Sequence, residues 1–358
     1  MSRNLQASPR VILHIGLHKT GTRFLQREVF GQLDPSRFNY NPEPLWPVLR
    51  QAVRHPGNQE RAARTREAIE EWRASEDKRT LVLSEPHISG DMFANHHDYA
   101  ENLELMRELF PEAEIIFFVR KQSDWLQSAY RQHLAKGKPI PIEAFLNFYQ
   151  GGFRPSMGRK VHGARNLEAL SLRFLEIYRA YAGAFGPDRV LLLRQEDLRE
   201  RQAEIKSLLA SFLGIAALPS PSRKRRHNRS YSALAIHLFH PSVLLRYPQP
   251  GPENVRDRRI PNWLNKLFGP LRRVRRNLIQ HVFDRIAYKD WDLLERNGMR
   301  ELIEAHYAEE NAELQRIAHT ILKNGPQIMV SEGRKKQHIS LNEEECTSLG
   351  SHSCSKLP

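Results

Sequence analysis

The chain has 358 residues, of which 40% are hydrophobic and 27% charged, with a formal net charge of +14. This length allows one large domain or two small ones, each able to bury a core. The excess of positive charge predicts an anionic partner: a nucleotide, an acidic glycan, a nucleic acid or an anionic lipid. The composition is therefore compatible with an enzyme and with a binding protein. The length is sufficient for a chain that folds on its own.

Cysteine content and apolar runs bear on where the protein works. The two cysteines, Cys346 and Cys354, stand in a polar tail, so neither a disulfide framework nor a zinc site is indicated. Residues 1–9 are too short and polar for a signal peptide, and no apolar run is long enough to span a membrane. We therefore expect a cytoplasmic protein.

The segment after the first apolar run is the strongest functional signal. Residues 11–16 read as a buried strand, and a helical pattern starts a few residues later. A loop between a strand and a helix N-terminus presents unpaired backbone N–H groups, which bind anions. Lys19 adds a full charge, and Thr20 and Thr22 add hydroxyl donors. The loop should hold a phosphate.

This loop differs from the nucleotide-triphosphate loop, in which the lysine follows the second glycine. Here Lys19 precedes Gly21, and the order Lys-x-Gly-Thr resembles the 5′-phosphosulfate loop of sulfotransferases that use 3′-phosphoadenosine 5′-phosphosulfate (PAPS). The resemblance implies that Lys19, Thr20, Gly21, Thr22 and Arg23 bind the 5′-phosphate side of PAPS. Arg23 stands where the family usually has a second threonine, so one hydroxyl is lost while a backbone N–H is kept.

A second element strengthens the resemblance. Residues 114–120 read as another buried strand that ends in arginine, and residues 125–135 read as a helix that Ser123 and the following aspartate would cap. Sulfotransferases use an arginine at a strand end and a serine eight residues later for the 3′-phosphate of PAPS. The resemblance therefore implies that Arg120 and Ser128 take this role.

The order of the elements predicts an α/β fold. Four apolar strands are expected at 11–16, 80–84, 115–120 and 189–194. Helical patterns lie between them, notably at 61–73, 102–110 and 167–185. Such alternation favours a central parallel sheet with helices on both faces, a three-layer sandwich of the nucleotide-kinase or P-loop-like type. Two Pro- and Gly-bearing segments, 39–55 and 137–165, are expected as loops that cover the acceptor.

The tip of the second strand offers two general bases for an acceptor hydroxyl, Glu85 and His87. The resembled family uses either a glutamate or a histidine, so the resemblance does not choose. We favour Glu85 because it comes first after the strand, with His87 second and His18 as a further candidate. The alternative is that Glu85 only pairs with a basic neighbour while His87 is solvated.

The second part of the chain is strongly basic, with 14 Lys and Arg and two acidic residues in 223–276. In the resembled family a late basic loop closes over the adenosine and the 3′-phosphate, and Arg226 and Asn228 are the candidates here. A solvated linker is the equal alternative. Residues 263–287 alternate apolar positions with arginines, which suits either packing on the core or peripheral contact with an anionic membrane or polyanionic acceptor.

These features divide the chain into an α/β core at 1–222, a basic loop and helical extension at 223–326 that packs on the core, and a disordered tail at 327–358. A long helix is expected at 293–322.

The resemblance implies a sulfotransferase that moves the sulfuryl group of PAPS to an acceptor hydroxyl. We expect this hydroxyl to belong to a carbohydrate. An anionic glycan or a lipid is also compatible with the positive charge of the chain. No metal is required, since Lys19 and arginines can supply the electrostatic stabilisation. A kinase of the same fold is the main alternative, and the absence of a Mg²⁺ aspartate after the second strand counts against it. The second alternative is a nucleic-acid-binding protein. The sequence contains no recognised nucleic-acid-binding module, so no nucleic acid is expected as a partner.

Overall fold

The computed structural model describes residues 9–75, 77–135, 140–155, 166–219, 232, 236 and 291–324. Five parallel strands form its central sheet in the order β2-β3-β1-β4-β7. Their bounds are Val11–His14 for β1, Phe38–Tyr40 for β2, Thr80–Ser84 for β3, Glu114–Val119 for β4 and Val190–Arg194 for β7. The four strands expected from apolar runs are therefore present within one or two residues at each end.

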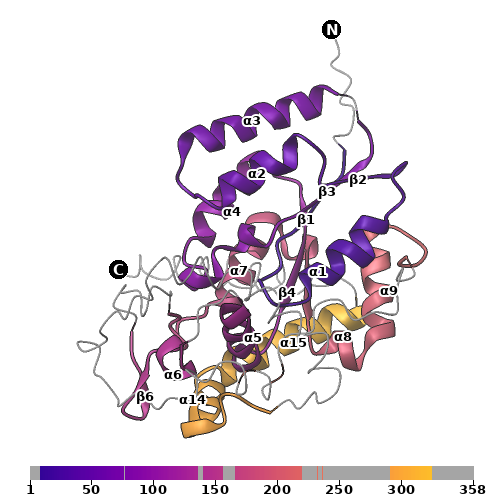
Figure 1. Cartoon of the computed structure of the whole chain (residues 1–358). Coiled ribbons are helices and arrows are strands. Elements are labelled where there is room, and N and C mark those ends of the chain that lie inside the picture. Colours follow the sequence, from indigo (N-terminus) through magenta and orange to yellow (C-terminus); the bar gives the residue numbers. More distant parts are fainter. Residues whose placement is uncertain are drawn as a thin grey trace, which may run out of the picture.

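Helices lie on both sides of this sheet, with α1 and α9 on one side and α4 and α7 on the other (Figure 1). The predicted three-layer α/β sandwich is thus confirmed. The helices and short helical turns have these bounds: α1 Thr22–Phe24, η1 Leu25–Val29, η2 Phe30–Gln32, α2 Leu45–Val53, α3 Gln59–Ala74, η3 Pro86–Ser89, η4 Met92–Ala94, α4 Tyr99–Leu109, α5 Gln122–Ala135, α6 Ile142–Phe145, α7 Phe174–Phe185, η5 Pro187–Arg189, α8 Asp197–Glu200, α9 Gln202–Leu213, η8 Arg296–Gly298, α14 Met299–His306 and α15 Ala308–Asn324.

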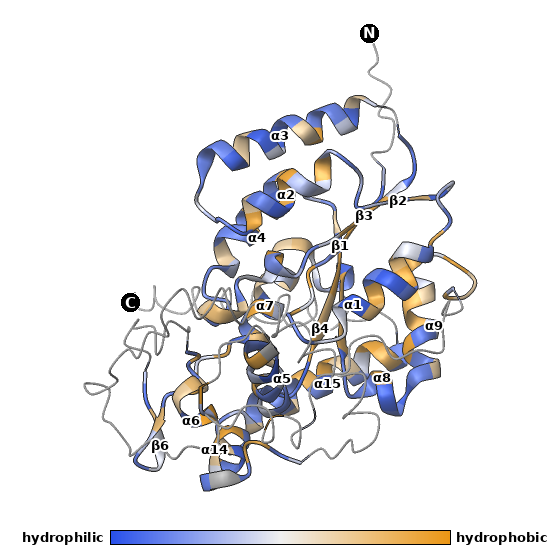
Figure 2. Ribbon diagram, viewed as in Figure 1, coloured by the Kyte–Doolittle hydropathy of each residue, from blue (hydrophilic) through white to orange (hydrophobic). Residues whose placement is uncertain are grey.

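Burial explains why the strands read as continuous apolar runs. Residues 115–119 of β4 and 190–193 of β7 are all buried, as expected for a parallel sheet covered on both faces. Figure 2 shows the strands coloured as hydrophobic, whereas the outer helix α3 is mostly hydrophilic. That helix contacts α2 and α4, so only one side of it needs apolar residues.

The segment 39–55 is not a loop, contrary to expectation. It contains the edge strand β2, which pairs with β3, and the helix α2. Prolines suggested a loop, but Pro47 lies in the first turn of α2, where the backbone N–H groups have no partner within the helix and proline is tolerated. The expected loop at 137–165 is described only at 140–155, where it holds α6 and a short hairpin of β5 (Phe148–Tyr149) and β6 (Gly152–Phe153).

Two predicted helices are shorter than expected, and Tyr307 contacts the boundary of both. The long helix at 293–322 is interrupted at Tyr307, between α14 and α15. The Tyr307 hydroxyl accepts a hydrogen bond from the backbone N–H of Leu172 and donates one to the carbonyl of Ala169. These bonds hold the segment before α7 in a non-helical form, so that helix begins only at Phe174.

The C-terminal helix α15 packs on the α/β core through Leu314, Ile317, Ala318 and Ile321, which are buried. It contacts α7, α9 and β7, the strand at one edge of the sheet, and thereby covers that edge. A second link comes from Arg300 of α14, which contacts Asp292, Glu304 and Asp124 of α5. Ser123 also joins this network, because its hydroxyl bonds to Glu304 and accepts from Arg300, rather than capping α5, which already begins at Gln122.

Two histidines are buried in the core near the ends of the strands. Burial lowers the pKa of His14 to about 3 and that of His96 to about 4, from the usual 6.5 of histidine. His14 bonds to the hydroxyl of Ser84 through Nδ1, and Nδ1 of His96 bonds to the carbonyl of Ser89. Both rings are therefore neutral in the folded protein near pH 7.

We expect the free energy of unfolding to fall as the pH falls from 6.5 to about 4. In this window the unfolded chain binds protons at His14 and His96 that the folded chain does not, so their contribution is complete above pH 6.5 and is lost below it. Each histidine should contribute up to about 1.4 kcal/mol per pH unit. Urea unfolding between pH 7 and pH 5 measures the slope. It should be shallower for His96→Asn and unchanged for the exposed-site variant His97→Ala; equal slopes in all three proteins would contradict this account.

Candidate functional site

The loop after β1 has the backbone conformation of an anion-binding turn. Lys19 has a φ of 71° and Gly21 a φ of 94°, both in the left-handed region. A non-glycine residue seldom adopts this conformation, and such residues concentrate at functional sites. The loop leads directly into α1, whose N-cap is Gly21.

Backbone donors of this loop are available to a ligand. In the described part of the chain, the backbone N–H groups of Thr20, Gly21 and Thr22 make no hydrogen bond. The Thr20 side chain is fully buried, and its hydroxyl donates to the carbonyl of Leu17 at 2.6 Å. Of the predicted threonine donors, Thr20 therefore offers its backbone N–H rather than its hydroxyl, and the hydroxyl of Thr22 lies 3.5 Å from the same carbonyl. Arg23 is exposed.

Arg120 and Ser128 lie next to the adjacent strand end. Arg120 follows β4 directly, and Ser128 lies in the second turn of α5. Both are half-buried, and neither side chain makes a hydrogen bond or ion pair within the described residues. Burial lowers the pKa of the Arg120 guanidinium, although the nearby carboxylates of Asp124 and Glu196 favour its charged form. A half-buried guanidinium with free donors suits an anionic ligand.

His18 connects the loop after β1 to α5 and to the segment that follows β3. Its backbone carbonyl accepts a 2.6 Å hydrogen bond from the indole N–H of Trp125, which lies on α5 between Arg120 and Ser128. Its imidazole ring stands edge-on to the ring of His87, with centroids 4.5 Å apart. Three elements that are distant in sequence therefore meet at the carboxyl ends of β1, β3 and β4, where ligands bind in parallel sheets.

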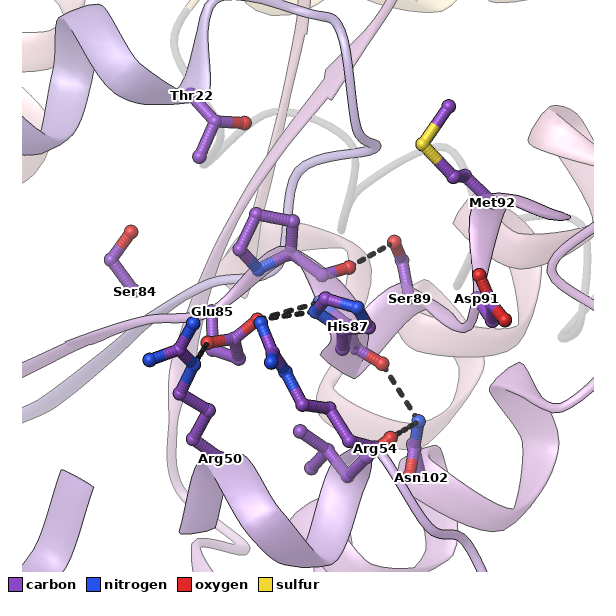
Figure 3. A network of polar contacts seen from close by, with 12 residues as sticks. Thr22, Arg50, Arg54, Ser84, Glu85, His87, Ser89, Asp91, Met92 and Asn102 are labelled. Carbon is purple, nitrogen blue, oxygen red and sulfur yellow. Dashed lines mark hydrogen bonds and ion pairs between the residues drawn. The ribbon is translucent and has the colours of Figure 1, made fainter. Parts of the chain in front are cut away.

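Glu85 and His87 form a hydrogen-bonded pair at the end of β3 (Figure 3). The Nδ1 atom of His87 lies 2.6 Å from Oε1 of Glu85, and the backbone N–H of His87 also donates to that oxygen. The Glu85 side chain is only 4% exposed, whereas that of His87 is 23% exposed. A carboxylate that accepts from Nδ1–H leaves the Nε2 lone pair of the histidine free to accept a proton.

Two arginines, Arg50 of α2 and Arg54 directly after its last residue, complete this part of the site, and sequence analysis missed both. Arg50 and Arg54 both form ion pairs with Glu85, so the carboxylate does have basic neighbours, as the alternative reading of that segment expected. Their i, i+4 spacing would have placed them on one helix face if the segment had been recognised as a helix. His87, however, is not merely solvated, because it is bonded to the same carboxylate.

Several expectations fall on residues that the structure does not describe. Arg226, Asn228 and the amphipathic segment 263–287 lie outside the described residues, as does the tail at 327–358. Within the described ranges, no group of three or more His, Cys, Asp or Glu side chains is placed to hold a metal ion. No helix in those ranges is long and apolar enough to cross a membrane.

Comparison with known proteins gives structural matches only. No family model matches the chain, and no curated protein matches its sequence. A sulfotransferase from Alicyclobacillus acidocaldarius is similar in structure, with 16% identity over 66% of this chain and 94% of that one and a TM-score of 0.41. A mouse sulfotransferase complexed with PAP matches 83% of this chain and 88% of its own length, with 14% identity and a TM-score of 0.33.

A sulfotransferase domain from the curacin biosynthetic pathway also matches, with 15% identity over 68% of this chain and 94% of its own and a TM-score of 0.36. The matched proteins are thus sulfotransferases, the family that the two sequence motifs resemble. At these identities the likeness concerns the fold, and the function of this chain is argued from its own site.

Proposed function

We propose that this protein is a sulfotransferase that moves the sulfuryl group of PAPS to an acceptor hydroxyl. One observation carries the proposal: His18 brings the phosphate loop into contact with Trp125 of α5 and with the ring of His87. An anion-binding loop, a half-buried arginine and a candidate base thereby share one edge of the sheet. Transfer between a nucleotide phosphate and a hydroxyl needs these three parts together.

The residues of the loop fit the 5′ side of PAPS. Free N–H groups of Thr20, Gly21 and Thr22, at the start of a helix, suit a phosphate, and Lys19 can stabilise the charge that develops on the leaving oxygen. Arg120 and Ser128 have free donors for the 3′-phosphate. PAPS, when bound, supplies the sulfuryl group and its phosphate leaving group. Arg23, Arg226 and Asn228 remain proposals from the resemblance alone.

The Glu85–His87 pair fits general-base catalysis by His87, which reverses our preference for Glu85. Both Glu85 oxygens already have partners, Oε1 in His87 and Oε2 in an ion pair with Arg50 at 3.1 Å, and only 4% of the Glu85 side chain is exposed, so a substrate hydroxyl reaches His87 more readily than the carboxylate. Glu85 instead holds a proton on Nδ1 of His87. As the acceptor oxygen forms its bond to sulfur and the bond from sulfur to the phosphate oxygen breaks, the hydroxyl proton passes to Nε2.

Sulfate transfer from radiolabelled PAPS to a panel of acceptor hydroxyls tests the function, with carbohydrates as the first acceptors to be tried. The proposal predicts a labelled product that forms without added metal. The same assay with labelled ATP and Mg²⁺ is the control. Phosphate transfer from ATP, with no transfer from PAPS, would instead favour the kinase reading of this fold.

Loss of Arg120 should weaken binding of adenosine 3′,5′-bisphosphate (PAP) selectively. Removing one charge-assisted contact costs about 1.5–3 kcal/mol, or roughly 10- to 100-fold in Kd. Calorimetry on Arg120→Ala should show this loss for PAP and almost none for 5′-AMP, which lacks the 3′-phosphate. Arg189→Ala, at the opposite end of the sheet, is the matched control and should leave both affinities unchanged. Equal losses for the two nucleotides would refute the 3′-phosphate role.

A further inference from the structure

Arg50 of α2 and Arg54, the C-cap of that helix, carry more positive charge than Glu85 neutralises. Arg50 Nε lies 3.1 Å from Oε2 of Glu85, and one terminal nitrogen of Arg54 lies 3.9 Å from Oε1. Figure 3 shows both side chains reaching from the helix toward this carboxylate, next to His87. Two guanidinium groups thus stand against one carboxylate. This excess lies beside the proposed base.

The guanidinium of Arg54 is open to a ligand. Its contact with Glu85 is longer than a hydrogen bond, and it makes no hydrogen bond within the described part of the chain. Its side chain is 34% exposed, whereas that of Glu85 is 4% exposed. A guanidinium offers five N–H donors in a planar fork, and this fork matches a carboxylate or another oxyanion in a bidentate manner.

Arg50 is held in place more firmly and faces the same region. Its guanidinium lies 5.0 Å from the ring centroid of Trp46, one turn earlier on α2, in addition to its ion pair with Glu85. Its side chain is nevertheless 38% exposed. Trp46, Arg50 and Arg54 follow one another at four-residue steps, so they share one face of the helix. A cation fixed in this way loses little freedom when a ligand binds.

Neutralising the buried Glu85 carboxylate accounts for one arginine but not for both. Arg50, whose Nε lies 3.1 Å from Oε2, is sufficient for that purpose as an ion pair, although this contact lacks the geometry of a hydrogen bond. Arg54 adds a second charge at the longer distance of 3.9 Å, and its side chain is 34% exposed. Its position is better explained by a ligand than by the stability of the fold.

We propose that Arg50 and Arg54 bind an oxyanion of the acceptor itself. The acceptor class is therefore a hydroxyl compound that carries a carboxylate or sulfate group close to the hydroxyl that is modified, as in an acidic saccharide. This inference rests on the proposed function for the meaning of acceptor, but the anion site can be tested without turnover.

The test compares two probes that differ by one carboxylate: p-nitrophenyl β-D-glucuronide and p-nitrophenyl β-D-glucoside. Calorimetry is carried out on the full chain with and without saturating PAP. We expect the glucuronide to bind about 10-fold or more tightly than the glucoside. Arg54→Gln should remove this preference without changing the affinity for the glucoside, and Arg54→Lys should restore it only in part, because an ammonium lacks the fork. The 6-sulfate of the glucoside, as a third probe, tells whether a tetrahedral anion is accepted as well as a planar one.

Arg64→Gln is the matched control, because Arg64 is an exposed arginine of the neighbouring helix α3 that pairs with Glu60. It should alter neither affinity. Equal binding of the two probes by the unchanged protein, no binding of either, or an equal loss of both in Arg54→Gln would overturn the inference. Failure of the proposed function would look different: PAP would not bind and no acceptor would be labelled, while the preference for the carboxylate would still be measurable.

Discussion

Replacing His87 with alanine should lower the rate of sulfuryl transfer about 10²- to 10⁴-fold, the usual effect of removing a general base. The affinity for PAP should change little, because the free donors that fit the nucleotide lie on the loop after β1 and on Arg120. The variant should also fold. The backbone N–H of residue 87 still donates to Glu85, and its carbonyl still accepts from Asn102 at 2.8 Å.

Glu85→Gln separates the two roles in this pair. An amide at this position can still accept a bond from His87 but no longer stabilises a positive charge on the ring, so we expect a smaller rate loss than for His87→Ala. The control is His97→Ala, which removes an exposed histidine of the same segment. Near-normal turnover by His87→Ala, together with a large loss in Glu85→Gln, would assign the base to Glu85.

The parts of this fold that the sequence made predictable are those in which a local pattern and the tertiary structure agree. β4 could be located because its residues are buried on both faces and therefore form an uninterrupted apolar run. The loop after β1, where we propose phosphate binding, could be located because a lysine, a glycine and a threonine stand between a strand and a helix. The contact between the loop and α5 could be expected only in outline, from the rule that the ends of parallel strands meet.

The parts that were missed depend on contacts between distant segments. The strand β2 has three residues, too few to show a pattern, and is defined by its pairing with β3. The break between α14 and α15 falls at Tyr307, whose hydroxyl is hydrogen-bonded to residues more than a hundred positions earlier in the chain. The helix α2 was hidden by Pro47 within it and by the prolines just before it, and the two arginines beside Glu85 were missed with it. The pairing of His87 with Glu85, on which our proposal of His87 as the base rests, depends on the turn η3 that follows β3.

Replacing Lys19 with methionine should reduce the turnover number about 10²- to 10³-fold, the effect expected when one preorganised charge-stabilising group is lost from a transition state. The physical reason is that Lys19 is the cation placed in the loop where the leaving phosphate oxygen would gain charge. The backbone at this position has a φ of 71°, and lysine and methionine, both unbranched at Cβ, adopt such an angle at a similar cost. Methionine keeps a similar length and the same backbone preference, so the variant tests the charge rather than the shape of the loop.

The expected signature of Lys19→Met is a fall in turnover larger than the fall in PAP affinity, because an interaction that strengthens in the transition state contributes more to the rate than to binding. Single-turnover transfer from labelled PAPS, together with calorimetry on PAP, measures both quantities. The control is Lys78→Met, an exposed lysine before β3 at the end of the sheet opposite the loop, which should change neither. If Lys19→Met instead weakened PAP binding and left single-turnover transfer at saturating PAPS unchanged, Lys19 would serve binding alone, and the charge on the leaving oxygen would have to be stabilised by another group.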